Sequence, residues 1–533
     1  MGEKYFQVYK SSAGSGKTFT LVREYLTIAL SGPNNFRHIL AITFTNKAAG
    51  EMKERVVKYL KAIRDVPFAE MDKGTREMAR QLAEGTGLEP DDLKERASMV
   101  LNNIIHYYTD FAISTIDSFV HRLVRSFAFD LNLPLEFEVA LNADELLSAV
   151  VEKLLTRVGK DPSLTSILVS FIESRAEDEG SWKIEKDLSK ASLTLFQEDS
   201  TEFIRKLRKL TPEDFRNILN KIHEEISRFE GRMETLGGEA LRLMEENSIS
   251  VSDFKHGKQG GAGVFFRKIK NNQFDSTVPG KSLKKSIEQD DSWVAGKADR
   301  ATADAIERLK GEFRQLYDEI QGYRDKHEKK YRLFSLMRKY IYQVATLTSI
   351  EQVIDEFRKE DHIVHISEFN KRIASVVLEE PVPFIYERIG ERYNHFLIDE
   401  FQDTSILQWQ NLIPLLENGL SSGNMSLVVG DTKQAIYRFR SGEVEQFAKL
   451  PELVPGVEDV ADRQRVLVNN YKEENLATNY RSSKEIVDFN NDFFTTLSRE
   501  LDQESREYYK EVIQKINKEK EGYVRLQFFD TKN

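Results

Sequence analysis

The sequence predicts an α/β protein in which strand-then-helix segments flank a long helical insertion. A glycine-bearing loop, Ser11 to Thr18, stands between a short alternating strand and an apolar helix. Short apolar runs that end in polar residues recur at 38–43, 395–399 and 426–429, as expected for buried parallel strands. Between about residues 134 and 361 this alternation gives way to long amphipathic helices, which indicates an inserted helical domain.

The bulk composition indicates a soluble protein with several structural units. A chain of 533 residues is too long for one core, so about three to four units are expected. No run of about 18 apolar residues predicts a transmembrane span, and the first residues lack the apolar core of a secretion signal. The absence of cysteine excludes disulfides and Cys nucleophiles and is typical of a reducing cytoplasm. The net charge of −10 confines any nucleic-acid surface to a local patch.

The loop Ser-Ser-Ala-Gly-Ser-Gly-Lys-Thr has the pattern of a phosphate-binding loop. Its glycines let successive N–H groups of Ser12, Ala13, Gly14, Ser15 and Gly16 face an anion, and the helix that follows points its positive end the same way. Lys17 supplies a charge for the β/γ-phosphates and Thr18 a hydroxyl for Mg²⁺. Ser11 stands where the usual pattern opens with Gly. A chance match in a surface turn is the alternative, but the order strand, loop, helix favours a nucleotide site.

Two consecutive acids follow the predicted strand at 395–399. Asp399 can hold Mg²⁺, directly or through water, and Glu400 can polarise the attacking water of a nucleotide hydrolysis. Solvated acids at a strand end are common, so this pair alone indicates little. Together with the phosphate loop it predicts a Mg²⁺-nucleotide site.

Aromatic and basic residues alternate after the predicted strand at 426–429. Gln434 offers an amide that can sense a phosphate, and Tyr437 and Phe439 are interleaved with Arg438 and Arg440. Aromatic faces that stack bases, flanked by cations for the backbone, are typical of a single-strand platform. Core packing is the alternative for Phe439.

Other elements are predicted from periodicity and turn signals. Helices are expected from Lys17 to Ser31, from Lys47 past Tyr59 and from Ala301 to Ala345, and strands at 110–116 and 523–529. The segment from Lys255 to Lys285 carries eight Lys or Arg against one acid, Asp275. It is interpreted as a solvated mobile loop, with a contact surface for a phosphate backbone as the alternative.

The order of these motifs resembles that of the UvrD/Rep branch of superfamily-one DNA helicases, and within it the RecB/AddA type. The matching segments span residues 11 to 483: 13–18 (AGSGKT), 43–49 (TFTNKAA), 115–119 (TIDSF), 399–404 (DEFQDT), 430–438 (GDTKQAIYR) and 479–482 (NYRS).

The resemblance implies roles for individual residues. Gln434 and Arg481 would contact the γ-phosphate of ATP, and Tyr480 would stack on adenine. Phe44, Tyr437 and Phe439 would line the path of single-stranded DNA. UvrD-type members carry an adenine-reading Gln on an upstream helix, where only Gln7, on a predicted strand, is available here. Asp117 stands where members commonly have His, and no DNA contact is assigned to it.

The resemblance also implies an architecture. A RecA-like P-loop motor domain would comprise residues 1–133 and 362–473, with a helical domain inserted at 134–361. Residues 474–533 would begin a second RecA-like domain. The later motifs of the family, including an arginine that completes the ATP site, have no counterpart in the sequence. We therefore expect an N-terminal portion of a longer protein that by itself shows little or no DNA-stimulated hydrolysis.

The function implied is ATP- and Mg²⁺-dependent translocation on single-stranded or tailed DNA, with unwinding, in cytoplasmic recombination or repair. One alternative is a translocase that feeds a nuclease without unwinding. Another is an ATP-gated DNA-binding or scaffolding subunit without productive turnover. A second subunit of an AddAB- or RecBCD-like complex is a possible partner.

Overall fold

The computed structural model divides the chain into two units, a sheet unit and a helical unit. The sheet unit comprises residues 1–143, 196–201 and 356–533, and the helical unit comprises 144–195 and 202–355. The four-part division expected from the sequence stays a prediction. The structure describes residues 4–131, 133–177, 183–198, 200–256, 261–274, 283–284, 287, 293–379, 384–438, 441–453, 460–510, 512–518 and 521–528.

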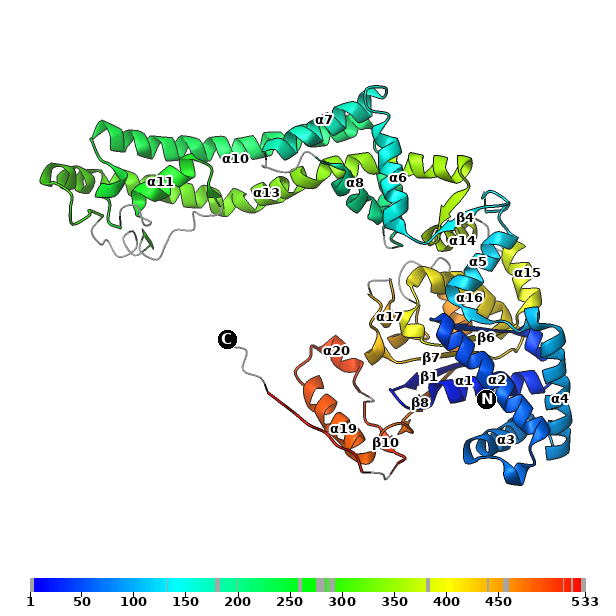
Figure 1. Cartoon of the computed structure of the whole chain (residues 1–533). Coiled ribbons are helices and arrows are strands. Elements are labelled where there is room, and N and C mark those ends of the chain that lie inside the picture. Colours follow the sequence, from blue (N-terminus) through cyan, green and yellow to red (C-terminus); the bar gives the residue numbers. More distant parts are fainter. Residues whose placement is uncertain are drawn as a thin grey trace. The chain divides into compact units, whose positions relative to one another are not determined.

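A six-stranded parallel sheet forms the centre of the sheet unit, with the spatial order β3-β2-β6-β7-β1-β8 (Figure 1). Its inner strands are apolar on both faces, as buried parallel strands require. In β7 all five residues are buried. The strands are β1 (Phe6–Ser11), β2 (Ile39–Thr43), β3 (Ile113–Thr115), β6 (His395–Ile398), β7 (Ser426–Gly430) and β8 (Tyr471–Leu476). The α/β class with a parallel sheet is thereby confirmed.

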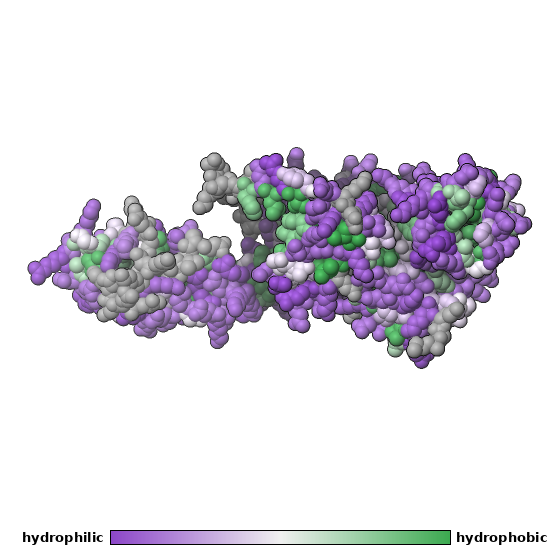
Figure 2. Space-filling view, turned by 90° about the horizontal axis from the view of Figure 1, so that it is seen from below, coloured by the Kyte–Doolittle hydropathy of each residue, from purple (hydrophilic) through white to green (hydrophobic). Residues whose placement is uncertain are grey.

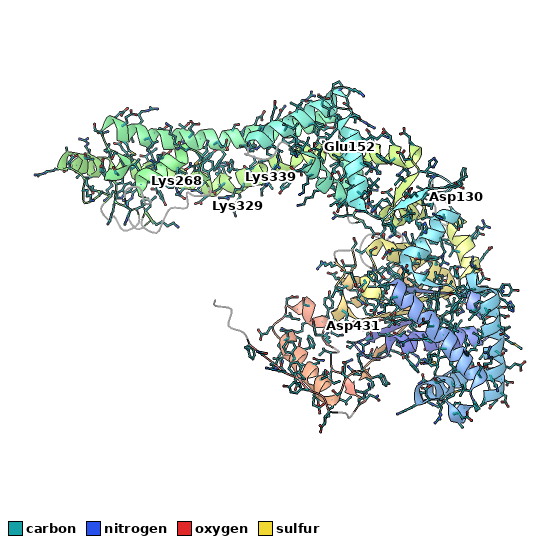
Figure 3. All side chains as sticks on the ribbon, in the orientation of Figure 1. Asp130, Glu152, Lys268, Lys329, Lys339 and Asp431 are labelled. Carbon is teal, nitrogen blue, oxygen red and sulfur yellow. The ribbon has the colours of Figure 1, made fainter. Side chains whose placement is uncertain are left out.

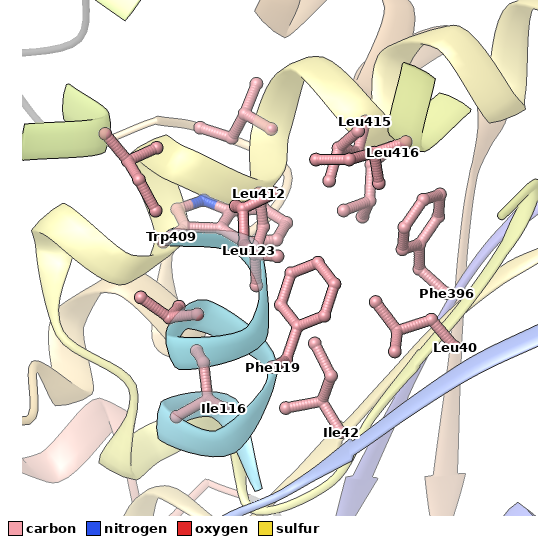
Figure 4. Packing of buried hydrophobic residues seen from close by; sticks show 14 of the residues in the cluster. Leu40, Ile42, Ile116, Phe119, Leu123, Phe396, Trp409, Leu412, Leu415 and Leu416 are labelled. Carbon is pink, nitrogen blue, oxygen red and sulfur yellow. The ribbon is translucent and has the colours of Figure 1, made fainter. Parts of the chain in front are cut away.

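Helices cover both faces of this sheet. Alternate strand residues belong to different cores: Leu40 and Ile42 to one, Ile39 and Ala41 to the other. One face packs α1 (Lys17–Leu30), α2 (Asn46–Asp65), α3 (Lys73–Thr86) and α4 (Pro90–His106). The opposite face packs α5 (Ile116–Ser126), α14 (Ser367–Glu379), α15 (Phe384–Arg392), α16 (Ile406–Ser421) and α18 (Val460–Asn470). Figure 4 shows Phe119 of α5 next to Ile42 of β2, and Leu412 of α16 next to Leu123 of α5.

Hydroxyl caps start helices directly after strands of the sheet. Thr45 Oγ1 accepts from the N–H of Ala48 to cap α2, and Thr115 Oγ1 accepts from the N–H of Ser118 to cap α5. Ser405 and Gln408 form a capping box at the start of α16. These caps fix where the chain leaves the carboxyl end of the sheet, which is where open α/β sheets bind ligands.

The helical unit is built on two long helices, α10 (Pro212–Glu246) and α13 (Arg300–Glu360), and the last residues of α13 belong to the sheet unit (Figure 1). Its core contains Phe229, Met233, Phe266, Trp293 and Phe313. Gly237 is required in α10 because a Cβ there would stand 2.5 Å from the backbone N of Lys270. The unit also contains α6 (Ala143–Leu155), which begins at its boundary, α7 (Pro162–Glu177), α8 (Glu185–Ser192), α9 (Thr201–Leu207) and α11 (Ala262–Lys270).

The interpretation of the basic segment as a loop was wrong for its middle part. Residues 262–270 form α11, and its apolar residues Phe265, Phe266 and Ile269 are buried in the core of the helical unit. Lys268 is therefore carried on a packed helix (Figure 3). Much of the remaining segment, 257–260, 275–282 and 285–286, lies outside the described residues.

The sheet unit contains further short elements. β4 (Glu138–Ala140) pairs with β5 (Ile363–His365), and β9 (Thr478–Asn479) pairs with β10 (Lys515–Ile516). Three further helices are α17 (Val444–Ala448), α19 (Lys484–Ser498) and α20 (Gln503–Glu507). The strand expected at 523–529 was wrong, because residues 521–528 pair with no strand of the described chain and residue 529 lies outside it. The face of this unit seen in Figure 2 is mostly hydrophilic, with hydrophobic residues in separate groups.

Candidate functional site

The candidate site lies at the carboxyl ends of β1, β6 and β7, three neighbouring strands of the parallel sheet. The loop after β1 carries residues 12–16, the turn after β6 carries Asp399 and Glu400, and the turn after β7 carries Asp431 and Gln434. Because the three strands are parallel, the turns that follow them all lie at the same edge of the sheet.

The loop between β1 and α1 depends on two glycines in left-handed backbone conformations. Gly14 has φ of 80° and Gly16 has φ of 88°. A Cβ at Gly14 would also stand 2.9 Å from Arg481 Cβ and 2.9 Å from Asn479 Oδ1. Ser11, which replaces the usual first glycine, donates its hydroxyl to the carbonyl of Gly430 over 2.6 Å and so ties the loop to β7.

Lys17, the first residue of α1, reaches across to the turn after β6. Its Nζ lies 3.0 Å from Oε1 and 2.9 Å from Oε2 of Glu400. Glu400 itself has a φ of 51°, which is strained for a residue other than glycine. The structure therefore brings together Lys17 and Glu400, two residues that are far apart in the sequence.

Carboxylates gather beside this ion pair. Desolvation, followed by the negative charge of Glu400, raises the pKa of Asp399 to about 7, whereas the charge of Lys17 opposes that shift. The same two causes, in the same order, raise the pKa of Asp403 to about 6. The negative charge of Glu400 therefore disfavours ionisation of both neighbouring carboxyl groups, and the ammonium of Lys17 offsets part of this effect.

Gln402 is a site residue that the sequence analysis did not single out. It is buried, its Nε2 donates to Glu400 Oε2 over 2.9 Å, and its Oε1 accepts from the N–H of Asp431 over 2.9 Å. It therefore joins the turn after β6 to the turn after β7. Its position within Asp-Glu-Phe-Gln-Asp could have marked it as a site residue. A sequence motif does not show, however, that the amide nitrogen and the amide oxygen each form a hydrogen bond to a different turn.

The turn after β7 positions Gln434. Asp431 is buried, accepts from Gln434 Nε2 over 2.5 Å, and forms an ion pair with Lys433 at 2.8 Å. Asp431 is labelled in Figure 3. The side chain of Gln434 is thus held at the same edge of the sheet as Glu400, through Asp431 and Gln402.

Residues 479–481 lie directly against the loop after β1. The N–H of Tyr480 donates to the carbonyl of Gly14 over 2.9 Å, and Asn479 Nδ2 donates to the carbonyl of Ala13 over 3.2 Å. The Tyr480 ring, 53% exposed, lies 3.6 Å from the position of a Cβ on Gly16. Gln7 lies elsewhere, within β1, where its Oε1 accepts from the Tyr9 hydroxyl.

Two of the three aromatics expected to contact DNA form a pair. The rings of Phe44 and Tyr437 have centres 4.6 Å apart and are tilted by 34°. Ile436, beside Tyr437, is 70% exposed. Phe439 lies outside the described residues, so its expected role stays a prediction.

The residues present fit a Mg²⁺ nucleotide. The buried hydroxyl of Ser15 has no hydrogen-bond partner among the described residues, which suits a phosphate oxygen as acceptor. Asp399 and Thr18 offer the oxygen ligands that Mg²⁺ prefers. No group of three or more His, Cys, Asp or Glu that could hold a metal occurs in the part of the chain that the structure describes, and Mg²⁺ commonly binds one or two carboxylates together with phosphates.

Comparison with known proteins decides the family. A model of the UvrD/REP helicase N-terminal domain matches residues 3–455. The chain belongs to this family. The resemblance predicted from the motifs is thereby confirmed.

Relatives of this UvrD/REP domain are helicase/nuclease subunits. An ATP-dependent helicase/nuclease subunit from Streptococcus sanguinis strain SK36 is 24% identical and covers 92% of the chain, which spans 38% of that relative. The exonuclease/helicase subunit RexA of Lactococcus lactis is 24% identical, with 92% of the chain and 39% of the relative covered. An ATP-dependent helicase/nuclease subunit from Clostridium novyi is 25% identical, with 92% and 38% covered. The chain thus spans about two fifths of the length of these relatives.

In the described part of the chain, none of the helices is long and apolar enough to cross a membrane.

Proposed function

We propose that this chain is the nucleotide- and DNA-binding part of an ATP-dependent single-stranded DNA translocase or helicase of recombination or repair. The observation that carries the proposal is the meeting of Lys17 and Glu400 at the carboxyl edge of the sheet, with Asn479 and Tyr480 hydrogen-bonded to the loop after β1. Membership of the UvrD/REP family supports the same conclusion.

In this proposal residues 1–133 and 362–473, which lie within the sheet unit, form a RecA-like P-loop motor domain. The helical domain at 134–361 is its insertion, and residues 474–533 begin a second RecA-like domain. The proposed boundary between residues 473 and 474 falls within β8, which pairs with β1 of the central sheet.

The loop residues Ser12 to Gly16 would bind the phosphates through backbone N–H groups, as Lys17 would through its ammonium. Thr18 and Asp399 would hold Mg²⁺, and Tyr480 would stack on adenine. When bound, ATP supplies the phosphoanhydride bond and Mg²⁺ supplies Lewis-acid charge stabilisation.

Glu400 would act as the general base that accepts a proton from the attacking water. Gln402 holds the Glu400 carboxylate through its 2.9 Å hydrogen bond to Oε2. The other oxygen, Oε1, accepts from Lys17 Nζ at 3.0 Å, and it would become free for water when Lys17 turns to the phosphates. Gln434 and Arg481 would contact the γ-phosphate from the turn after β7 and from the segment after β9. Gln434 and Arg481 would both lose their contact with the γ-phosphate when ATP is hydrolysed. They are therefore suited to couple hydrolysis to movement of the protein.

Single-stranded DNA would pass over the rings of Phe44 and Tyr437, joined by Phe439. The hydrogen bonds from Glu400 through Gln402 and Asp431 to Gln434 end three residues before Tyr437. A change at the nucleotide can therefore reach the DNA through a short chain of contacts. A second subunit of a helicase/nuclease complex is the protein partner that the names of the relatives suggest.

The test is steady-state ATP hydrolysis by the full-length protein, measured with and without single-stranded DNA. Stimulation by DNA that disappears in Lys17→Ala supports the motor. The rival function, an ATP-gated binding or scaffolding subunit, predicts nucleotide-dependent DNA affinity without DNA-stimulated turnover. A protein that binds DNA equally in the presence and absence of ATP, and hydrolyses nothing, refutes both.

A further inference from the structure

A groove of about 580 Å³ runs along α2 in the sheet unit. One wall is formed by a row of α2 side chains, Lys53, Val57 and Lys61, which recur every fourth residue and so share one face of the helix. The other wall is formed by Tyr108 and Phe111, just before β3. Val57 and Phe111 give the groove an apolar lining. Its charged lining residues are three lysines, Lys53, Lys58 and Lys61, and two acids, Glu54 and Asp65, so cations outnumber acids by one.

Lys53, which lines this groove, feels the charge of a second cation, Arg122, which is not among the lining residues. Lys53 Nζ lies 5.5 Å from the centre of the Tyr108 ring. Arg122 of α5 donates to Ser114 Oγ over 3.2 Å. Burial, followed by the charge of Arg122, lowers the pKa of Lys53, so the two cations are close enough to repel each other. An anion bound between them relieves this repulsion.

Exposed aromatic rings accompany these cations. Tyr107 and Tyr108 are 50% and 58% exposed. The guanidinium of Arg37 lies 3.9 Å from the centre of the Tyr107 ring, as Lys53 lies over Tyr108. Exposed rings beside cations, next to an apolar groove, are the combination that binds bases by stacking and phosphates by charge.

We propose that this groove is a second contact for single-stranded nucleic acid, in which a base stacks on Tyr108 and phosphates lie at Lys53 and Arg122. The inference rests on the proposed function and extends its DNA path beyond Phe44 and Tyr437. The helix α2 starts at Asn46, two residues after Phe44, and Lys53 is about 10 Å farther along the helix. A strand that leaves the Phe44–Tyr437 pair can therefore continue along α2. An acidic protein segment would use the cations but not the exposed ring.

The test compares the full-length protein's affinity for thymidine oligonucleotides of about 6 and about 20 nucleotides, by fluorescence anisotropy over a range of salt. For the longer strand, Lys53→Ala combined with Arg122→Ala should lower the salt slope by about 1.4, since two phosphate contacts are lost. Tyr108→Ala should weaken that affinity roughly 5- to 150-fold. The shorter strand should be unaffected.

Matched controls come from α2 and from the end of α4, near Lys53 and Tyr108 in the sequence. Arg55→Ala removes a cation from α2 that does not line the groove, and Ile105→Ala removes an exposed apolar side chain from the end of α4. Both should bind the longer strand as the wild type does. Iododeoxyuridine placed along that strand should crosslink to Tyr108 on irradiation.

Three results would overturn the inference. If the groove variants bind the longer strand with unchanged slope and affinity while Phe44→Ala weakens binding, the groove is not a contact and the proposed function survives. If polyglutamate competes for the groove and Tyr108→Ala has no effect, the occupant is an acidic protein segment. If the wild type binds no single strand at all, the proposed function fails together with the inference.

Discussion

We expect the replacement of Glu400 by Gln in the full-length protein to separate nucleotide binding from hydrolysis. Glu400 accepts two contacts from Lys17, at 3.0 and 2.9 Å, and one from Gln402 at 2.9 Å. Glutamine keeps the shape but not the charge or the basicity. The lost ion pair is partly exposed, at 13% for Lys17 and 32% for Glu400, and is therefore worth only about 1 kcal/mol in stability.

The expected result is a loss of hydrolysis by roughly 10² or more, the usual scale for a missing general base, with Mg·ATP affinity changed by no more than a few-fold. Affinity is preserved because Lys17, released from its carboxylate partner, stays available to the phosphates. Binding is followed with a fluorescent ATP analogue and hydrolysis in single-turnover experiments. Lys17→Ala should instead weaken binding, and Glu24→Gln on α1 should change neither. If Glu400→Gln lowers binding as much as hydrolysis, the carboxylate holds nucleotide rather than activating water.

Three further substitutions test the DNA path, the packing inside the helical unit and a buried histidine of the sheet unit. Phe44→Ala should weaken single-strand affinity by about 1 to 3 kcal/mol with little dependence on base sequence. The control Phe129→Ala, which removes an aromatic side chain that is 79% exposed, should leave this affinity unchanged. If Phe44→Ala lowers the melting temperature but binds single strands normally, Phe44 is a core residue. Gly237→Ala should destabilise the helical unit by about 1 to 3 kcal/mol in chemical unfolding, since its Cβ meets backbone, while Gly238→Ala, facing open space, should not. Burial, followed by the charge of Lys371, lowers the pKa of His365 to about 4, below its value in the unfolded chain. The contribution of neutral His365 to the free energy of unfolding should therefore be fully present above about pH 6.5 and decline as the pH falls toward 4. His365→Asn should make the melting temperature depend less on pH in this range, and an unchanged pH dependence would contradict the assignment.

The inner strands of the sheet and the glycine loop could be predicted because local sequence specifies them. β2, β6 and β7 are apolar along nearly their whole length, which is what burial on both faces requires. β8 could not be predicted in the same way. Its sequence, Tyr-Lys-Glu-Glu-Asn-Leu, is polar because it lies at the edge of the sheet, where Glu473 pairs with Lys10 of β1.

Errors elsewhere came from tertiary packing that composition does not report. The charges of the 255–285 segment suggested a loop, yet the apolar spacing of Phe265, Phe266 and Ile269 buries one side of α11 against its neighbours. The final apolar alternation suggested a strand, but residues 521–528 have no strand partner among the residues described. Nor did the sequence indicate that residues 196–201 pack with the sheet unit, where the Phe196 ring stacks on His365 with centres 4.1 Å apart.

Gln402 lies within a motif found in the sequence, yet its two hydrogen bonds in the site could not be predicted from that motif. It joins Glu400 to the Asp431 turn with both ends of one buried amide, and Asp431 in turn holds Gln434. Gln402→Ala leaves the N–H of Asp431 without its acceptor, a loss of about 1 to 3 kcal/mol in stability, and frees the Glu400 carboxylate to move. In the full-length protein, basal hydrolysis should fall modestly while its stimulation by single-stranded DNA is lost, because the connection between the two turns is broken. Gln410→Ala, on α16 outside this network, should keep both. If the ratio of DNA-stimulated to basal hydrolysis is unchanged in Gln402→Ala, then the coupling passes through other contacts and Gln402 serves only to hold Glu400 in place.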